Sequence, residues 1–285
     1  MKRKTFFLFA GPSVIIMVLL MILPLFAATW LGFHYITFRN ITEPEFVGLR
    51  NYTDVLRDPQ FWDAMRFTIL YVAVTVPSRI VIGFVVALLL DQVVRFRGIY
   101  IAGMLLPYVV TPVVGTLIYR QAFDKAGLFT YLIKTIFDYK LFFNPPTVRM
   151  LILLHGIWVA TPFTMIVLFA GLQTLPKEPL EAALVDGATW LQRLWYVVIP
   201  YLRSLFVFTA LIGIMDAYRV FDSVFVLSQL NPNYDASIMT YNFRVALSYG
   251  RLGKANAMSI LTVVGIFVVL IPFLYMTYRE QVEER

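Results

Sequence analysis

Long apolar stretches constrain this chain more than any other feature of its sequence. A helix needs about 20 residues to cross the hydrocarbon core of a bilayer, and six stretches of helix length occur here. They predict an all-α, polytopic membrane protein that forms a single transmembrane domain over residues 1–285. The expected transmembrane helices lie at about residues 6–33, 67–90, 99–119, 151–172, 201–228 and 257–278.

The composition supports a membrane location and excludes several other classes. Hydrophobic residues make up 60% of the 285 residues and charged residues 14%, whereas a soluble domain is about half apolar and about a quarter charged. The net charge of +7 does not indicate a nucleic-acid partner, because the basic residues are scattered over the loops and form no stripe. With no cysteine and two histidines, we expect no disulfide and no metal site.

The distribution of basic residues predicts the orientation of the chain. The first apolar stretch follows a basic start, as in a signal peptide, but it is longer than the apolar region of such a peptide and is predicted to remain as a helix. Lysine and arginine favour the cytoplasmic side of short loops. Because their density is higher in the segments that would share one side, both termini are expected in the cytoplasm; these segments are residues 1–5, 91–98, 173–203 and 279–285.

A polar segment separates the fourth and fifth apolar stretches. Pro179 is placed to begin a helix, and Glu178 and Glu181 lie near its start, where the helix dipole favours negative charge. Gly187 permits a bend. The segment therefore predicts a short amphipathic helix at about residues 178–190 on the cytoplasmic face, with an apolar face formed by residues at helical spacing, Leu180, Leu184, Leu191 and Trp195.

This segment carries a resemblance to a known family. Glu181-Ala182-Ala183, then three residues, then Gly187, then a stretch that ends in Ile199-Pro200, resembles the EAA motif of ABC importer permeases. In that family the loop forms a coupling helix, which docks in a groove of the ATP-hydrolysing subunit. The resemblance implies a type I ABC importer transmembrane domain, in which the residues that couple to the ATPase are Glu181, Ala182, Ala183, Asp186 and Gly187.

Other segments extend the resemblance over nearly the whole chain. Residues 48–52, Leu106-Pro107-Tyr108 and Ala170-Gly171-Leu172 are similar to segments of sugar-type permeases, in particular of the maltose, trehalose and glycerol-phosphate type. One segment departs from the pattern: residues 228–232, which include Leu230, replace a Thr-x-Gly-Gly-Pro stretch after the fifth helix. The solute is therefore left open among a disaccharide, a monosaccharide, a polyol, glycerol phosphate and an anionic sugar.

The resemblance also implies partner chains. A second, homologous permease subunit would complete the pathway, two ATPase subunits would bind ATP and Mg²⁺, and a soluble or lipid-anchored binding protein would deliver solute to the outer loops of a bacterial or archaeal plasma membrane. The sequence contains no Gly-x-x-x-x-Gly-Lys-Ser/Thr phosphate loop. We therefore expect no cofactor, catalytic residue or enzymatic activity on this chain, and its remaining partner is membrane lipid.

Three charged residues lie in the second half of the fifth apolar stretch. Charged side chains at bilayer depth are costly and usually face a cavity or a partner. Asp216, Arg219 and Asp222 are spaced i, i+3 and i+6, so one alternative is a structural ladder of ion pairs along one helix. The other alternative is a polar lining for the solute path, in which Tyr218 and Phe221 would stack on sugar rings.

Arg79 is the only charged residue in the second apolar stretch. It is expected either to pair with Asp216 or Asp222 or to bind an anionic group of the solute; in both cases it would face the interior and not the lipid. Small residues one turn apart, Gly156 with Ala160 and Gly213 with Ala217, would let neighbouring helices approach closely.

The predicted function is that of a permease subunit of an ATP-driven ABC importer. It would form half of the pathway for a carbohydrate or related polyhydroxylated solute and work by alternating access. An ion-coupled secondary transporter and an integral membrane enzyme are the alternatives. The first would suit the three charges of the fifth stretch but usually shows internal repeats, which we do not find. The second requires clustered catalytic groups, whereas the charges here are dispersed.

Overall fold

The computed structural model describes the backbone of residues 3–229 and 231–283, and the side chains of residues 9–229, 231–272, 274 and 275. Leu230 and residues 1, 2, 284 and 285, which belong to the departing segment and to the termini expected in the cytoplasm, lie outside the described residues. The chain divides into two compact units, one made of Met1–Asp63 and Ile238–Phe267 and the other of Ala64–Ser237 and Val268–Arg285.

The predicted all-α, polytopic membrane fold is confirmed. Within the described residues, four helices are long and apolar enough to cross a membrane, and up to six if each of two bent helix pairs counts as one span. The four straight candidates are Phe9–Gly32, Pro59–Gln92, Pro145–Gln173 and Leu252–Pro272, and the bent pairs are Arg97–Val109 with Pro112–Phe137 and Trp190–Tyr201 with Arg203–Tyr218.

The first unit ties a short two-stranded sheet to the ends of long helices. The amide of Asn51, which is buried, donates to the carbonyl oxygens of Gly32 and His34, both at 2.9 Å. It thereby joins α2 to the end of α1. The elements of this unit are α1 (Arg3–Gly32), β1 (His34–Tyr35), the antiparallel β2 (Glu45–Phe46), α2 (Arg50–Leu56), α13 (Ile238–Phe243), the π-helical turn η2 (Arg244–Ser248) and the start of α14 (Leu252–Glu283).

A carboxylate at the start of α3 (Pro59–Gln92) links three segments of the first unit. Pro59 suits the first helical position, and Asp58 caps the turn by accepting from the backbone N–H of Gln60 at 3.0 Å. The Oδ2 atom of Asp58 also accepts from the Tyr241 hydroxyl and from Lys254 Nζ, each at 2.6 Å. Burial alone would raise the pKa of Asp58, but these hydrogen bonds and the charge of Lys254 outweigh it and hold the pKa below its usual value.

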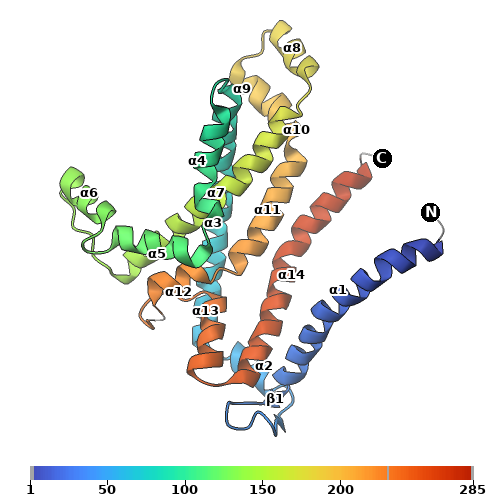
Figure 1. Ribbon diagram of the computed structural model, residues 1–285, viewed down its shortest axis with the longest axis vertical. Coiled ribbons are helices and arrows are strands. Elements are labelled where there is room, and N and C mark those ends of the chain that lie inside the picture. Colours follow the sequence, from blue (N-terminus) through green and yellow to red (C-terminus); the bar gives the residue numbers. More distant parts are fainter. Residues whose placement is uncertain (1–2, 230, 284–285) are drawn as a thin grey trace. The chain divides into compact units, whose positions relative to one another are not determined.

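The second unit is a helical bundle in which α4 packs against α7, and α12 packs against α5 and α7 (Figure 1). Its helix α7 begins at Pro145 and Pro146, and the Asn144 side chain caps it by accepting from the Thr147 N–H. The other elements, besides most of α3, are α4 (Arg97–Val109), α5 (Pro112–Phe123), α6 (Leu128–Phe137), α7 (Pro145–Gln173), α8 (Lys177–Val185), α9 (Trp190–Arg193), η1 (Leu194–Val198), α10 (Ile199–Tyr201), α11 (Arg203–Tyr218) and α12 (Asp222–Ser228).

A buried apolar cluster joins the spans of the second unit at the end nearest α8. Its members come from α3, α7, η1 and the α10–α11 junction: Ala87, Leu90, Met165, Leu168, Phe169, Leu172, Val198 and Leu202. Leu180 of α8 and Leu194 of η1 pack against this cluster. The segment between α7 and α11 is therefore attached to the spans through side-chain packing as well as through the chain.

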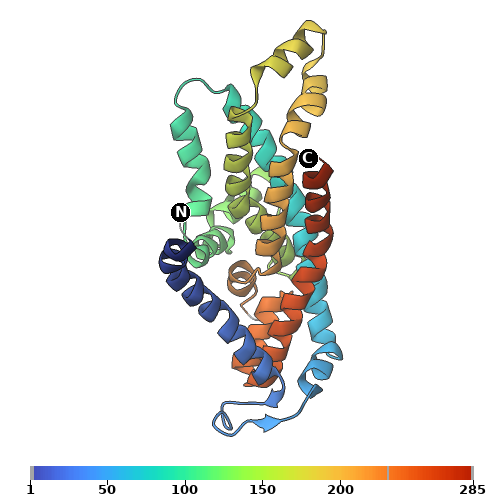
Figure 2. The same cartoon turned by 90° about the vertical axis from the view of Figure 1, so that its right-hand side faces the viewer.

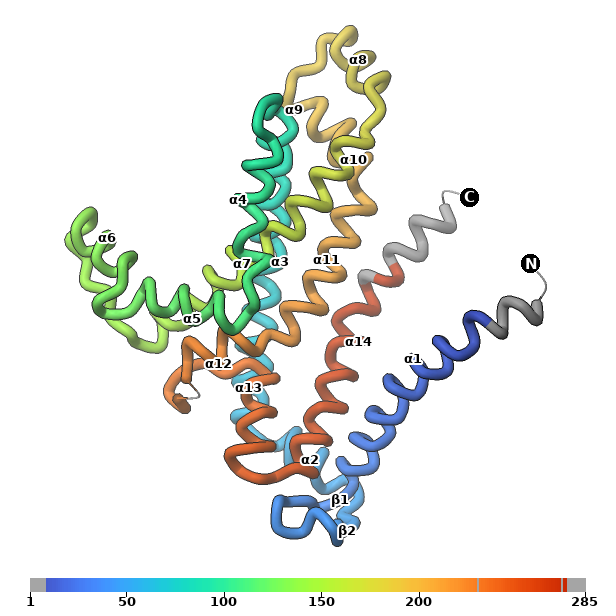
Figure 3. The backbone as a smooth tube through the Cα atoms, in the orientation of Figure 1, coloured from blue at the N-terminus to red at the C-terminus, as the bar shows by residue number. Residues whose placement is uncertain are grey.

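Two helices that the sequence predicted as continuous are broken. The stretch expected as one helix at 99–119 consists of α4 and α5, which meet at 96°; Figure 3 shows the turn. Pro112 lacks an N–H and disfavours helical backbone at Thr111, which is extended. The stretch expected at 201–228 is likewise divided, because Leu202, Arg219 and Phe221 depart from helical backbone angles.

We expect Asp58→Asn to loosen α13 in the first unit. Hydrogen bonds to charged groups contribute roughly 1.5–3 kcal/mol each, so the protection of the α13 amides against hydrogen exchange should fall by about 2 kcal/mol at neutral pH. Because the folded-state pKa of Asp58 is lowered, its contribution is fully present above the ordinary value of about 3.9 and is lost as the pH falls through the lowered pKa.

Amide exchange of residues 238–243 at pH 7 and at pH 3 measures both effects. Protection in the wild type should fall at the lower pH, and protection in the Asp58→Asn variant should be low at both. Equal protection of the two proteins at pH 7 would show that this carboxylate does not hold the segment.

Candidate functional site

A small polar cavity lies within the second unit, where α3 and α7 meet the junction between α11 and α12. Its volume is about 180 Å³. Five of the six residues that the sequence singled out for a solute path line it, namely Arg79, Asp216, Arg219, Phe221 and Asp222. Other lining residues with polar groups are Tyr71, Thr75, Thr116, His155 and Ser223.

One face of α3 supplies the first wall of the cavity. Tyr71, Thr75 and Arg79 are spaced i, i+4 and i+8, so they lie on the same side of the helix, and all three are buried. The sequence analysis considered only Arg79. The signal that would have found the other two is a polar residue on every turn of a stretch that is otherwise apolar.

Arg79 is almost completely buried, with 5% of its surface exposed, and its Nε and Nη2 atoms have no hydrogen-bond partner among the described residues. The guanidinium lies against Gly213 of α11, where a Cβ atom would collide with Nη2. The expected ion pair with Asp216 or Asp222 is not formed, although Arg79 and both carboxylates line the same cavity. An arginine at bilayer depth costs roughly 3 kcal/mol, so this side chain is held at an energetic cost.

The three charges of the fifth stretch do not form a ladder. A ladder with i, i+3 and i+6 spacing requires one continuous helix, but α11 ends at Tyr218 and α12 begins at Asp222. Arg219 instead donates from Nε to the carbonyl oxygen of Met215 at 3.3 Å. Irregular backbone at membrane depth is tolerated where it is covered by protein or lines a cavity, and the segment between the two helices does line this one.

Tyr218 lies outside the cavity. Its side chain is buried, with 1% of its surface exposed, and its hydroxyl points to the Sδ atom of Met65 at 3.5 Å. A role in stacking on a solute is therefore not available to Tyr218 in this structure. Phe221 does line the cavity, and its ring stacks on that of Phe225 with the centroids 5.1 Å apart.

The predicted cytoplasmic helix is shorter than its sequence suggested. Helix α8 ends at Val185, and Gly187 follows with a φ of +76°, in the left-handed region that favours glycine. A capping box between Thr189 and Gln192 then begins α9. The helix expected at about 178–190 is thus two helices, and Leu191 and Trp195 do not continue the apolar face of α8.

Helix α8 stands beyond the ends of the long helices of its unit, as two views at right angles show (Figures 1 and 2). Glu181, Ala182, Asp186 and Gly187 are exposed, and Ala183 is half-buried.

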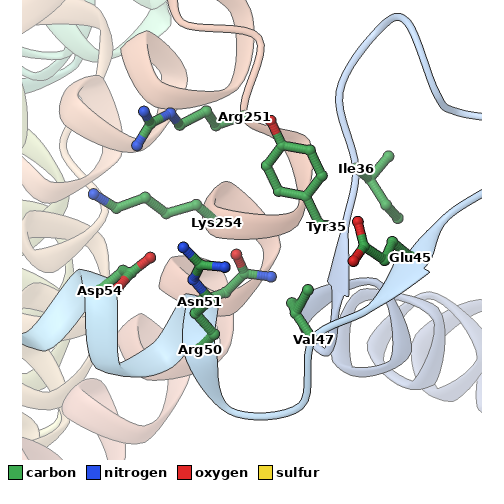
Figure 4. Close-up of a pocket in the computed structure, with 9 residues that line it drawn as sticks. All are labelled: Tyr35, Ile36, Glu45, Val47, Arg50, Asn51, Asp54, Arg251 and Lys254. Carbon is green, nitrogen blue, oxygen red and sulfur yellow. The ribbon is translucent and has the colours of Figure 1, made fainter.

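A second, charged pocket lies in the first unit, with a volume of about 360 Å³. Figure 4 shows Arg50 and Asp54 of α2 with Arg251 and Lys254, near the start of α14, and Glu45 of β2 on the strand side. Lys254 pairs with Asp58. Side chains of both signs therefore line this pocket, a pattern that suits a polar protein contact.

Comparison with known proteins gives a consistent result. No protein-family model matches the chain. It is 30% identical to a probable ABC transporter permease protein, y4oQ, of Sinorhizobium fredii over 95% of this chain and 89% of that protein. It is also 30% identical to the trehalose/maltose transport system permease protein MalF of Thermococcus litoralis over 95% of this chain and 92% of that protein.

The fold is shared with a solved structure. A chain in the crystal structure of a bacterial ABC transporter involved in the import of the acidic polysaccharide alginate superimposes with a TM-score of 0.81, over 97% of this chain and 96% of that chain. The two sequences are 19% identical, so this likeness concerns the fold alone.

We expect Arg79→Leu to raise the thermal stability of the purified protein. The substitution removes a buried cation of which two donors are unpaired, and relief of a burial cost of roughly 3 kcal/mol outweighs the lost packing. The control is Arg149→Leu, because Arg149 donates to both carboxylate oxygens of Asp235 at 2.7 and 2.8 Å. The control should be no more stable than the wild type. A clear loss of stability in Arg79→Leu would mean that its guanidinium is satisfied in the membrane.

Proposed function

Because the chain belongs to the family of ABC transporter permease subunits, we propose that it forms half of the translocation pathway of an ATP-driven importer. The observation that carries the proposal is the combination, in one unit, of a polar cavity among apolar helices with a short helix that stands clear of the helix ends. The cavity would hold the solute, and the short helix, α8, would transmit the movement of an ATPase subunit to the membrane helices.

The solute is a carbohydrate or a related polyhydroxylated compound. Relatives of the chain are named for the transport of trehalose and maltose and, in Bacillus subtilis, of arabinooligosaccharides. The cavity suits such solutes, because hydroxyl, imidazole, carboxylate and guanidinium groups line it together with the ring of Phe221. The lining charges, Arg79 and Arg219 against Asp216 and Asp222, balance, which favours a neutral solute over an ion.

Coupling to ATP hydrolysis occurs at α8 and the turn that follows it. Glu181 offers an exposed charge, the alanines at 182 and 183 let the helix sit deep in a groove, and Gly187 turns the chain back toward the membrane. Leu180 packs against the apolar cluster that joins α3, α7 and the start of α11. A displacement of α8 by a partner would therefore be carried directly to the helices around the cavity.

The assembly contains further chains. A second, homologous permease subunit closes the pathway, two ATPase subunits bind ATP and Mg²⁺, and a binding protein delivers the solute. The chain lies in the plasma membrane with both termini in the cytoplasm, and α8 faces the ATPases. The charged pocket of the first unit offers a polar surface to the binding protein.

The complex is tested by gentle detergent extraction of the tagged chain from its native membrane. An ATPase subunit and a second membrane subunit are expected to co-purify, and the eluate should hydrolyse ATP. Recovery of the chain with only itself, under conditions that keep known complexes intact, would favour an ion-coupled transporter.

We expect Glu181→Lys to reduce ATP-driven uptake at least about tenfold while the chain still inserts normally, since an interfacial charge that loses its partner costs roughly 2–5 kcal/mol. Glu178→Lys is the matched control, because it makes the same charge reversal on the exposed first turn of the same helix. Equal uptake by the two variants would remove the special role of Glu181.

We expect Gly187→Asp to abolish uptake and Gly187→Asn to reduce it less. The φ of +76° at this position strains a residue with a Cβ atom by roughly 1–2 kcal/mol. Asparagine and aspartate tolerate this angle best, but aspartate also places a second negative charge directly after Asp186. Uptake is measured in vesicles that contain equal amounts of the chain. Normal uptake by the aspartate variant would show that the turn after α8 is not needed for coupling.

A further inference from the structure

The guanidinium of Arg79 points at the backbone of α11 and not at an acceptor. A Cβ atom at Gly213 would lie 3.1 Å from Nε, 2.9 Å from Cζ and nearest of all to Nη2. The edge that carries Nε and Nη2 therefore faces Gly213. This is the edge with which arginine grips a carboxylate by two hydrogen bonds, and in this chain Arg149 uses the same two atoms to bind Asp235.

The carboxylate of Asp216 lies about one turn beyond Gly213 on α11. Asp216 is three residues after Gly213, so the two positions lie on nearly the same face of α11 and about 4.5 Å apart along its axis, at about 1.5 Å per residue. Because Cα–Cβ bonds tilt toward the N-terminus of a helix, the Asp216 side chain leans toward the turn that holds Gly213. Asp216 lines the cavity together with Arg79, and Gly213 lies against the Arg79 guanidinium.

Helix α11 is a short helix with a break at each end. At its start, Leu202 departs from helical angles and the chain bends by 65°. At its end, Arg219 and Phe221 interrupt the helix before α12. The helix is thus separated at both ends from its neighbours, and its start adjoins the apolar cluster against which Leu180 of α8 packs.

We propose that Arg79 is a positioning residue whose guanidinium has two alternative contact positions, or stations, on α11: the first at Gly213 and the second at Asp216. In the state of this structure it rests on Gly213 with its Nε–Nη2 edge unpaired, and in a second state of the transport cycle α11 slides or rotates by less than one turn and the same edge binds Asp216 by two hydrogen bonds. The inference rests on the proposed function, since displacement of α8 by the ATPase would drive the shift. Formation of the pair would remove two opposite charges from the wall of the cavity and thereby change its hold on the solute.

The absence of a side chain at position 213 is what makes the first station possible. A methyl group there would displace the guanidinium, so Gly213→Ala should favour the second station and change the rate of ATP hydrolysis by the complex. Arg79→Gln, which has a shorter side chain, should suppress the effect of Gly213→Ala. Gly156→Ala is the matched control, because its Cβ atom would meet the Tyr71 hydroxyl and not Arg79; Arg79→Gln should not suppress its effect.

The central experiment is a double-mutant cycle on the purified complex of this chain with its co-purifying subunits. Thermal unfolding is recorded for the wild type, Arg79→Gln, Asp216→Asn and the double variant, once without nucleotide and once after trapping with ATP and vanadate. In one state, the shifts in the thermal unfolding midpoint of the two single variants should add up to the shift of the double variant. In the other state, the double variant should deviate from this sum by several degrees. A cycle on Arg149→Gln and Asp235→Asn, whose pair is already formed, is the control and should show the same coupling in both states.

Two other results would overturn the inference. Coupling between Arg79 and Asp216 that is equal in the two states, whether large or zero, would mean that there is no second station. Failure of Arg79→Gln to suppress Gly213→Ala would mean that the glycine serves another contact. A wild-type complex that hydrolyses no ATP would instead refute the proposed function and, with it, this mechanism.

Discussion

The close approach of α3 to α7 and α11 is the contact on which the rest of the second unit depends. Lipid gives helices little reason to associate by burial of apolar surface, so their packing relies on small residues that let backbones come near. Tyr71 fits over Gly156 and Arg79 over Gly213. These two glycines allow large polar side chains to be enclosed between helices, and the cavity is formed where those side chains meet.

The broken helices follow from the same constraint. A bilayer core offers no water to unpaired backbone groups, so a break is possible only where protein or a cavity covers it. The interruption between Tyr218 and Asp222 lines the cavity, and the break before Pro112 brings that residue to the same wall. Irregular backbone and polar side chains therefore occur together, because the same cavity keeps both away from the lipid.

The ends of the spans nearest α8 and the segment that contains α8 are connected by packing and not by the chain alone. Leu180 of α8 contacts the cluster that contains Leu168 and Leu202, and Leu202 immediately precedes α11, the helix that carries Gly213 and Asp216. Because close-packed interiors transmit strain rather than absorb it, these contacts support the proposed coupling between α8 and the helices around the cavity, where the guanidinium of Arg79 has two unpaired donors.

The sequence alone determined the fold class, because helices must be long and apolar to cross lipid. It also singled out the charges within the spans, because a charge at that depth is costly. Tertiary structure decided how those charges are used. Helical spacing offered a ladder of Asp216, Arg219 and Asp222 as one of two alternatives, whereas a break in the backbone separates them. The candidates from the sequence included Tyr218, which packs on Met65, and omitted Tyr71 and Thr75. Spacing defines neighbours only along one continuous helix, while the cavity is made by α3, α7 and α11 together, and which side chains meet there depends on the packing between helices.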